Sequence, residues 1–225
     1  LNVDGNKTNL DELVANLNQL NHNFSVIGLA ETNIDTDNKD TYRITDDYTS
    51  VYQSGSAGKH KGSGVGMYIH NKHNFTKLNS LSICNENIET LFVSITNLEQ
   101  PTTVGVLYRP PSGSMKLFNK ELQSLLSSIQ TCSNTYILGD FNVNLLNLIN
   151  SQDEEFEEIM LTSFHPLIST ATHAQPHCAS TCIDNIFTSN PNKVTTSGTL
   201  DWNISHHSPI FQLSEYHSKS SPKGE

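Results

Sequence analysis

The sequence predicts one layered α/β domain in which mixed β-sheets are covered by helices. Three segments repeat apolar residues at helical spacing, and short apolar runs of strand length recur along the whole chain. Several of these runs follow one another directly while the helices intervene irregularly, which fits mixed sheets better than a regular βαβ repeat. A chain of 225 residues with neither a repeat nor an internal linker can bury such a core as one domain.

The helical segments are recognised by their spacing. Leu10, Leu13 and their successors recur three and four residues apart, which predicts a helix over residues 10–20, with Asn9 and Glu12 at its start. Residues 115–129 carry a second such stripe. The SQDE run at residues 151–154 matches a capping box and predicts the start of a third helix that continues to residue 164.

The expected strands are short apolar runs, and two of them lead into polar residues. They cover residues 24–29, 64–69, 91–95, 103–108, 136–138, 183–187 and 209–213. The first run leads into Glu31, and the 136–138 run leads into Gly139 and Asp140. Since magnesium binds one or two protein carboxylates, Glu31 is a candidate metal ligand.

Asp140 is followed two residues later by Asn142. Residues i and i+2 of an extended chain face the same way, so the carboxylate can deprotonate a water while the amide donates to a charged oxygen. Asp and Asn are also common in turns that end strands, and that interpretation stays open at this point.

Asp184 lies inside an apolar run, where an acid must be either satisfied or functional. His206 and His207 stand just before the last expected strand. A buried carboxylate that holds an imidazole fixes its tautomer and stabilises its charged form. Asp184 and His207 are candidates for such a pair, although nothing in the sequence places them together.

Four residues of zinc-ligand type fall between positions 173 and 182: His173, His177, Cys178 and Cys182. Structural zinc sites usually join two ligand pairs from separated turns, and four ligands on one short loop are cramped. A zinc site is therefore a minor alternative.

The chain carries 13 basic and 23 acidic residues, a formal net charge of −10, which argues against a general nucleic-acid coat protein. Residues 56–77 nevertheless hold four lysines and no acid, whereas residues 121–192 hold no lysine or arginine. Lys59 and Lys61 predict a local phosphate-contacting loop, with an ordinary solvated loop as the alternative. No apolar stretch approaches the roughly 18 residues of a membrane helix, and the first residue, Leu1, suggests a fragment of a longer polypeptide.

Taken in order, the motifs resemble the endonuclease domain of non-LTR (LINE-type) retrotransposons, in the apurinic-endonuclease-like branch of the exonuclease–endonuclease–phosphatase superfamily. Each motif is weak singly, but their order along nearly the whole chain is specific. They are LNV at 1–3, VIGLAET at 26–32, GSGVGMYI at 62–69, IETLFV at 88–93, GVLYRPP at 105–111, ILGDFN at 137–142, IDNIF at 183–187 and HSPIF at 207–211.

The resemblance implies a four-layered α/β sandwich, with two mixed β-sheets packed face to face and helices outside, over residues 1–217, followed by a tail or linker at 218–225. It implies a Mg²⁺-dependent endonuclease, with Mn²⁺ as a substitute, that nicks DNA by water attack on a phosphodiester. The nick leaves a 3′-hydroxyl that primes reverse transcription. The implied partners are double-stranded DNA and the rest of the retrotransposon polyprotein, including its reverse transcriptase. We expect a monomeric domain without a membrane partner, acting inside the cell, in the nucleus.

The resemblance also assigns roles by motif match. Asn2 and Glu31 lie on the metal side, and Tyr108 contacts the scissile phosphate. Asp140 activates the attacking water, while Asn142 helps to hold that water or the phosphate.

Further along the chain, Asp184 orients His207, which stabilises the charge on the phosphorane-like transition state. Arg109 is expected to contact DNA together with Lys59 and Lys61.

Two positions depart from the family pattern. His206 stands where relatives carry an Asp that supports the metal or water network, and Pro111 stands where some relatives carry an Asn. A catalytically weakened nucleic-acid-binding remnant is therefore one alternative. Another phosphodiesterase or phosphatase of the same superfamily is the second, although the YRPP turn and the short length favour the retrotransposon branch.

Overall fold

The computed structural model describes residues 1–3, 7–20, 22–34, 44–55, 63–129, 134–175, 177–202, 204–217 and 219. The helices of this part are α1 (Lys7–Gln19), α2 (Met115–Ser127) and α3 (Ser151–Leu161), with short 3-10 turns η2 (Asn79–Leu81) and η3 (Pro191–Lys193). Its strands are β1 (Val26–Ala30), β2 (Tyr48–Gln53), β3 (Val65–His70), β4 (Phe75–Lys77), β5 (Glu89–Ile95), β6 (Thr102–Tyr108), β7 (Asn134–Asp140), β8 (His165–Pro166), β9 (Asp184–Thr188), β10 (Val194–Thr199) and β11 (Ile210–Ser214).

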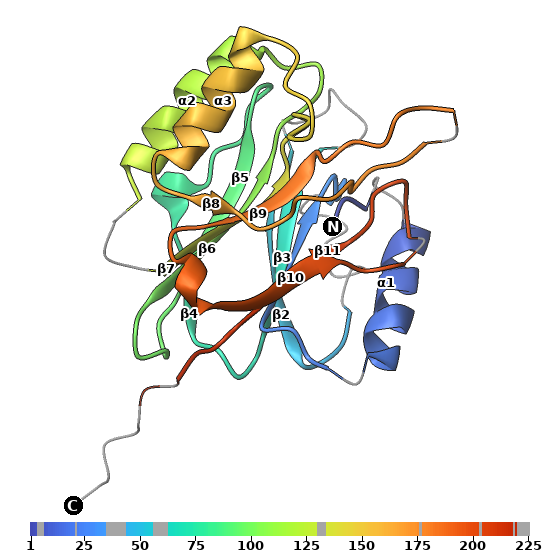
Figure 1. Cartoon of the computed structure of the whole chain (residues 1–225). Helices are drawn as coiled ribbons and strands as arrows, with labels where there is room; N and C mark the ends of the chain where they lie inside the picture. Colours follow the sequence, from blue (N-terminus) through green and yellow to red (C-terminus); the bar gives the residue numbers. More distant parts are fainter. Residues whose placement is uncertain are drawn as a thin grey trace, which may run out of the picture.

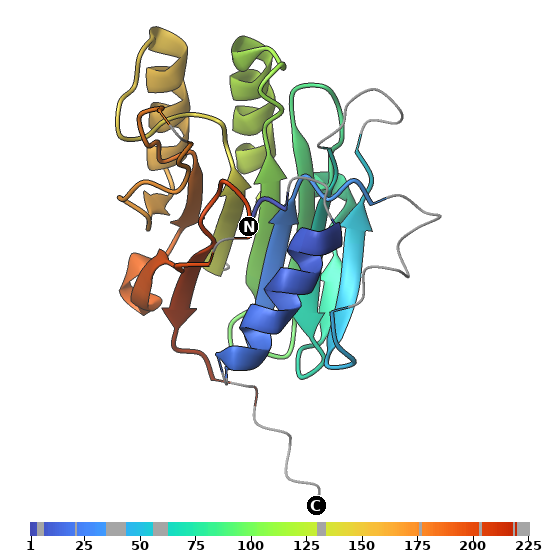
Figure 2. The same cartoon turned by 90° about the vertical axis from the view of Figure 1, so that its right-hand side faces the viewer.

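The strands form two facing layers between helices (Figures 1 and 2). One layer is a six-stranded mixed sheet of order β4-β5-β6-β7-β9-β8, in which β6 and β7 run parallel. The facing layer consists of two antiparallel sheets, β1-β3-β2 and β10-β11. Helices α2 and α3 cover the outer face of the six-stranded sheet, and α1 covers the β1-β3-β2 sheet.

This arrangement confirms the predicted layered α/β fold, with one difference. The second layer was expected to be a single mixed sheet, but it is divided, and both of its parts are antiparallel. The division arises because β1 and β11 do not pair with each other in the described part of the chain, and a groove separates them.

Apolar side chains fill each interface between layers. Between α2, α3 and the six-stranded sheet, the rings of Phe141 and Phe187 lie 5.1 Å apart, and Phe156 packs on both. Met67 and Val106 belong to the cluster between the two strand layers, and residues of α1 complete a third cluster over β1 and β3. Because successive side chains of a strand point to opposite faces of the sheet, each sheet can present apolar side chains to the layers on both of its faces.

The predicted helices and strands are all present, with shifted ends. The N-cap of α3 was assigned wrongly: the side-chain oxygen of Asn150, not Ser151, accepts from the amides of Gln152 at 2.9 Å and Asp153 at 3.1 Å. Strands β2, β4, β8 and β10 were not predicted, because they are short or rich in Ser and Thr and partly exposed.

The strand directions gather polar residues at one edge of the sandwich. Tyr108 lies opposite Asp140 across the parallel β6–β7 pair, and Asp140 lies opposite Asp184 across the antiparallel β7–β9 pair. Asn2 bridges to Ala30 at the end of β1, one residue before Glu31. The fold therefore brings together side chains that are far apart in the sequence.

None of the described helices has the length and apolar character needed to cross a membrane. Apart from residue 219, the tail expected at 218–225 lies outside the described residues, and the domain boundary stays a prediction.

Candidate active site

Two buried carboxylates form the centre of the site. Asp140 is 1% exposed and Asp184 is 4% exposed, on neighbouring strands in register. Gly139 precedes Asp140 with a φ of +154°, and a Cβ there would meet the carbonyl oxygen of Leu107 at 1.8 Å. Only glycine fits this close approach of β7 to β6, so Gly139 fixes where the Asp140 carboxylate stands.

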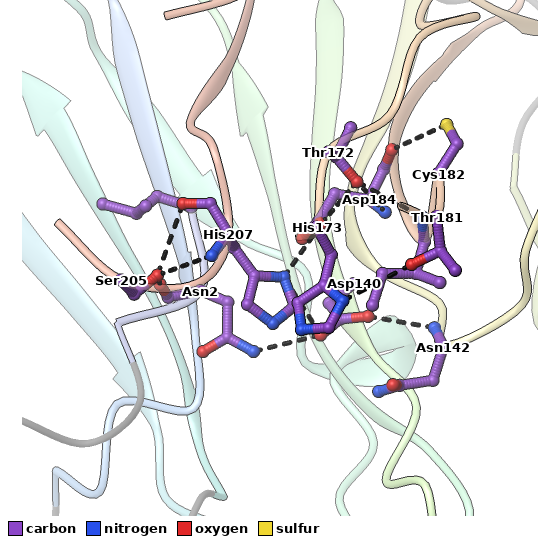
Figure 3. Close-up of polar contacts among 12 residues, drawn as sticks. Asn2, Asp140, Asn142, Thr172, His173, Thr181, Cys182, Asp184, Ser205 and His207 are labelled. Atoms are coloured by element: carbon purple, nitrogen blue, oxygen red, sulfur yellow. Dashed lines mark hydrogen bonds and ion pairs between the residues drawn. The ribbon is translucent and has the colours of Figure 1, made fainter. Parts of the chain in front are cut away.

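The imidazole of His207 lies against these two carboxylates (Figure 3). Its Nδ1 is 2.9 Å from Oδ2 of Asp184 and 4.0 Å from Oδ2 of Asp140. Burial favours the neutral ring, but the hydrogen bond to Asp184 and the nearby carboxylate charges raise the pKa of His207 overall. The ring therefore tends to hold a proton and to present a positive charge beside the two acids.

The threonine Thr172 holds Asp184 in place. Its hydroxyl donates to Oδ2 of Asp184 at 2.8 Å and accepts from the Asp184 amide at 3.1 Å. Asp184 is thus bonded to Thr172 on one side and to His207 on the other, which fixes its orientation.

Burial raises the pKa of Asp140 to about 7, with the charge of Asp184 as the second cause. The nearby His207 and the hydrogen bonds from Asn2 and from the Asn142 amide act in the opposite direction. A carboxyl with this pKa can take up and release a proton near neutral pH, as a general base must.

Asn2 links Asp140 to the acid that follows β1. Its side-chain amide donates to Oε1 of Glu31 at 2.8 Å and to Oδ2 of Asp140 at 3.0 Å. Glu31 has a positive φ of 53°, and the backbone after it is held by a 3.0 Å hydrogen bond from the Thr32 amide to the Gly64 carbonyl. The strand end therefore turns so that Glu31 faces the Asp140 cluster.

The phenol of Tyr108 closes this side of the site. Burial, then the charge of Glu31 and a hydrogen bond with it, raise the pKa of Tyr108 well above its ordinary value. The hydroxyl stays protonated at any physiological pH and can donate to an anionic ligand.

The donor set of the site suits a hard divalent cation. One possible ligand atom from each of Asp140, Asp184 and His207 lies within 4.8 Å of the other two. Among the described residues, these are the side chains that lie close enough together to hold a metal ion. The carboxylate of Glu31 adds oxygen donors beside it, linked to Asp140 through the side-chain amide of Asn2. Magnesium and manganese prefer such oxygen ligands.

The residues considered for zinc do not form a site in the described structure. The ring of His173 packs on that of His207, with centroids 4.6 Å apart, whereas Cys178 is exposed. Cys182 is buried, and its thiol faces the backbone carbonyls of Ile168 and Asp184. His173, Cys178 and Cys182 therefore lie in different environments, and the described residues do not bring the four candidates together as a zinc site.

Arg109, which was expected to contact DNA, is held by the backbone of the turn after Asp140, and its contact with DNA stays a prediction. The residue is only 8% exposed, and its guanidinium donates to the carbonyls of Phe141 and Asn142, both at 2.8 Å. The side-chain amide of Asn142 in turn donates to the Arg109 carbonyl at 2.9 Å. Arg109 thus fastens the turn after Asp140, and the role of Asn142 toward water or phosphate stays a prediction.

Three further residues, Lys59, Lys61 and His206, were predicted to contact DNA or to support the metal or water network. Lys59 and Lys61 lie outside the described residues. Lys72 is described, and it follows the end of β3 opposite to the site. His206 is exposed, and its backbone carbonyl accepts from the Ala174 amide at 3.2 Å.

Sequence reasoning missed two residues at the site, Thr172 and Glu89, and considered His173 only as a zinc ligand. Glu89 is 1% exposed, lies opposite Tyr108 in register, and accepts from the Gly64 amide at 2.6 Å. An acid that begins an apolar strand was a usable signal for Glu89. No local pattern marks Thr172 or the contact of His173 with the His207 ring, because both depend on residues far along the chain.

The layered sandwich has the fold of apurinic endonucleases and of related nucleases and phosphatases. The chain is similar to the endonuclease domain of TRAS1, a telomere-specific non-LTR retrotransposon, with a TM-score of 0.73 over 93% of both chains at 11% identity.

Two further solved structures show the same likeness. An AP endonuclease from Archaeoglobus fulgidus has a TM-score of 0.72 at 15% identity, over 95% of this chain and 97% of its own. AP endonuclease LMAP from Leishmania major has a TM-score of 0.70 at 15% identity, over 96% of this chain and 86% of its own. No protein-family model and no curated protein matches the sequence. At these identities the likeness establishes the fold.

Proposed function

We propose that this chain is a divalent-metal-dependent endonuclease that nicks double-stranded DNA. The observation that carries the proposal is the buried cluster of Asp140, Asp184 and His207 within 4.8 Å, at one edge of a nuclease-type sandwich. The likeness to the TRAS1 endonuclease domain and to two AP endonucleases supports the choice of DNA as the substrate.

The residues of the chain divide the work of hydrolysis. Asp140, with a pKa of about 7, takes the proton of the attacking water. His207, oriented by Asp184, donates to a non-bridging phosphate oxygen and stabilises the charge that develops there. The protonated phenol of Tyr108 donates to the same phosphate group.

Glu31 and Asn2 would hold the metal ion, together with the Asp140 side of the cluster. When bound, a divalent cation neutralises phosphate charge and stabilises the leaving oxygen. The oxygen-rich donor set favours Mg²⁺ or Mn²⁺ over zinc.

The proposed biological role is the first step of retrotransposition. The nick leaves a 3′-hydroxyl at the target, and a reverse transcriptase in the same polyprotein extends it on the RNA of the element. The partners of the domain are then double-stranded DNA and the rest of that polyprotein, and its place of action is the nucleus. The likeness to the TRAS1 domain supports this role.

Nicking of supercoiled plasmid tests the activity. The wild type should convert plasmid to the open circle with Mg²⁺ or Mn²⁺ and not with a chelator, and DNA polymerase should extend the nick without phosphatase treatment. Asp140→Asn should lose roughly 10²–10⁴-fold in rate. Asp11→Asn, an exposed carboxylate change on α1, is the matched control and should keep full activity. Chelator-resistant nicking, or an active Asp140→Asn, would refute the assignment.

The same assay separates the alternatives. A disabled remnant would retard DNA in a binding assay without nicking it under any metal. A phosphatase of the same fold would release phosphate from phosphomonoesters and leave the plasmid intact.

A further inference from the structure

The imidazole ring of His173 packs on the ring of His207. Their centroids lie 4.6 Å apart and their planes meet at 52° (Figure 3). The His207 side chain is 13% exposed, and its Nδ1 is bonded to Asp184 at 2.9 Å. The χ2 torsion of a histidine has a broad energy minimum, so a hydrogen bond at one nitrogen leaves the ring plane free to tilt. The His173 ring restricts that tilt on the face that it covers.

The backbone fixes where the His173 ring stands. On one edge, the His173 amide donates to the Thr181 carbonyl and the Thr181 amide donates to the His173 carbonyl, both at 3.0 Å. On the other edge, His173 forms an antiparallel bridge with His207, and the Ser208 amide donates to the Thr172 carbonyl at 2.7 Å. Side chains directly opposite each other across an antiparallel bridge lie on the same face. Main-chain pairing therefore brings the two rings together.

The same short segment holds both members of the Asp184–His207 pair. The hydroxyl of Thr172 donates to the Asp184 carboxylate at 2.8 Å, and the next residue, His173, packs on the imidazole of His207. Burial, and then the charge of His207, lower the pKa of His173, whereas the pKa of His207 is raised. The contact thus places a neutral ring against a ring that tends to hold a proton, without repulsion between like charges.

We propose that His173 is a positioning residue for the imidazole of His207. Its ring packs on the face of His207 so that Nδ1 stays on Asp184 and Nε2 is left to donate to the phosphate group. Thr172 and His173 then fix the acid and the imidazole of the pair from one segment. The inference rests on the proposed function, because the orientation of His207 affects the rate only if the ring acts on a phosphate.

Three variants separate the packing of the ring from its chemistry. His173→Phe keeps an aromatic ring without nitrogen, His173→Gln keeps polar atoms without a ring, and His173→Ala removes both. A small misplacement of a reacting group can cost about 100-fold in rate. We therefore expect the Ala and Gln variants to lose about 10- to 100-fold in kcat for plasmid nicking, with little change in KM for DNA. The Phe variant should retain most of the wild-type kcat.

The matched control is His177→Ala, which replaces an exposed histidine of the same segment and should keep the wild-type kcat. Thermal unfolding of each variant shows whether it is folded, and the Gln variant carries the test if the Ala variant is not. In a His207→Ala background, His173→Ala should cost nothing further, because a positioning residue acts through the group that it holds.

A second readout does not depend on nuclease activity. In protein labelled with ¹⁵N-histidine, the Nδ1–H of His207 that is bonded to Asp184 should give a low-field NMR signal, assigned by its loss in His207→Gln. The wild type and His173→Phe should both show this signal. In the Ala and Gln variants its proton should exchange with water at least about tenfold faster, because the ring can leave Asp184 more often.

An unchanged kcat together with an unchanged His207 signal in the Ala and Gln variants would overturn the proposal. A Phe variant as slow as the Ala variant would also overturn it, since the imidazole of His173 would then take part in the chemistry itself. So would an undiminished loss in the His207→Ala background. If the wild type did not nick DNA at all, the proposed function would fail, while the NMR signal would still decide whether His173 holds the His207 ring.

Discussion

Asp140 and Asp184 are register partners on β7 and β9, and both are almost completely buried at the edge of the six-stranded sheet. Two carboxylates in this position destabilise each other when both are ionised. One protonated imidazole, that of His207, lies within 4.0 Å of both. Keeping the basic carboxylate of Asp140 beside the anionic Asp184 lowers the folding stability of the protein, and this loss can be measured.

The first prediction concerns the stability of the metal-free protein. The pKa of Asp140 rises from 3.8 to about 7 on folding, so between these values the folded protein holds a proton that the unfolded chain has released. The stabilising contribution is complete below about pH 4 and is lost as the pH rises through 7. With chelator present, Asp140→Asn should therefore raise Tm at pH 8 by about 5–10 °C and have little effect near pH 4. A Tm difference that is the same at both pH values would contradict the assignment.

The second prediction concerns Asp184 and His207, whose side chains are 2.9 Å apart. Each alanine variant should lose roughly 10²–10⁴-fold in nicking rate. If Asp184 acts by orienting His207, the double variant should be little worse than either single one. Thr172→Val should give a smaller loss, because it removes the two hydrogen bonds of the Thr172 hydroxyl to Asp184 but leaves the carboxylate and the imidazole in place. Additive losses would show that the two residues act separately.

The third prediction concerns His206, which occupies the position of an acid in the family that the sequence resembles. A carboxylate near the site attracts magnesium, whereas an imidazole suits softer cations such as manganese. His206→Asp should lower the Mg²⁺ concentration needed for half-maximal nicking, and Mn²⁺ should stimulate the wild type more than the variant. His165→Asp, another exposed histidine, is the control. Superimposable Mg²⁺ titrations would mean that position 206 does not influence the metal.

The fourth prediction separates a structural Arg109 from a DNA-contacting one. The guanidinium donates to three backbone carbonyls, which a single ammonium cannot reproduce. Arg109→Lys keeps the charge, and we expect it to cost about 2 kcal/mol of unfolding free energy and to lower the nicking rate. The salt dependence of DNA binding should not change. A flatter salt dependence with unchanged stability would restore the DNA-contacting role.

The fifth prediction concerns the lysines at positions 59 and 61. Replacing both with alanine should weaken DNA binding and reduce the log–log salt slope by about 0.9 for every phosphate that the protein no longer neutralises. The control pair is Lys72→Ala with Lys116→Ala, two exposed lysines, of which Lys72 follows the end of β3 opposite to the site. If both pairs change the slope equally, the effect comes from net charge rather than from positions 59 and 61.

The sequence by itself determined the elements and the chemical types present at the site. Helical spacing predicted α1 and α2, and apolar runs predicted the central strands, because these segments bury one face along their whole length. Asp140, Asp184 and His207 were recognisable, since acids in apolar runs and a histidine before a strand are exceptions to the local pattern. Strands β2 and β10 were not predicted, because half-exposed strands rich in Ser and Thr do not form apolar runs.

The tertiary structure decided which residues meet. The pairing of β7 with both β6 and β9 sets Tyr108, Asp140 and Asp184 side by side, and strand register is a property of long-range pairing that no local pattern encodes. The burial of Arg109 was not predicted, because the carbonyls of Phe141 and Asn142 that hold its guanidinium come from the turn after β7, far along the chain. The division of the second layer into two sheets could not be predicted either, because it depends on which strand edges remain unpaired once the other strands have paired.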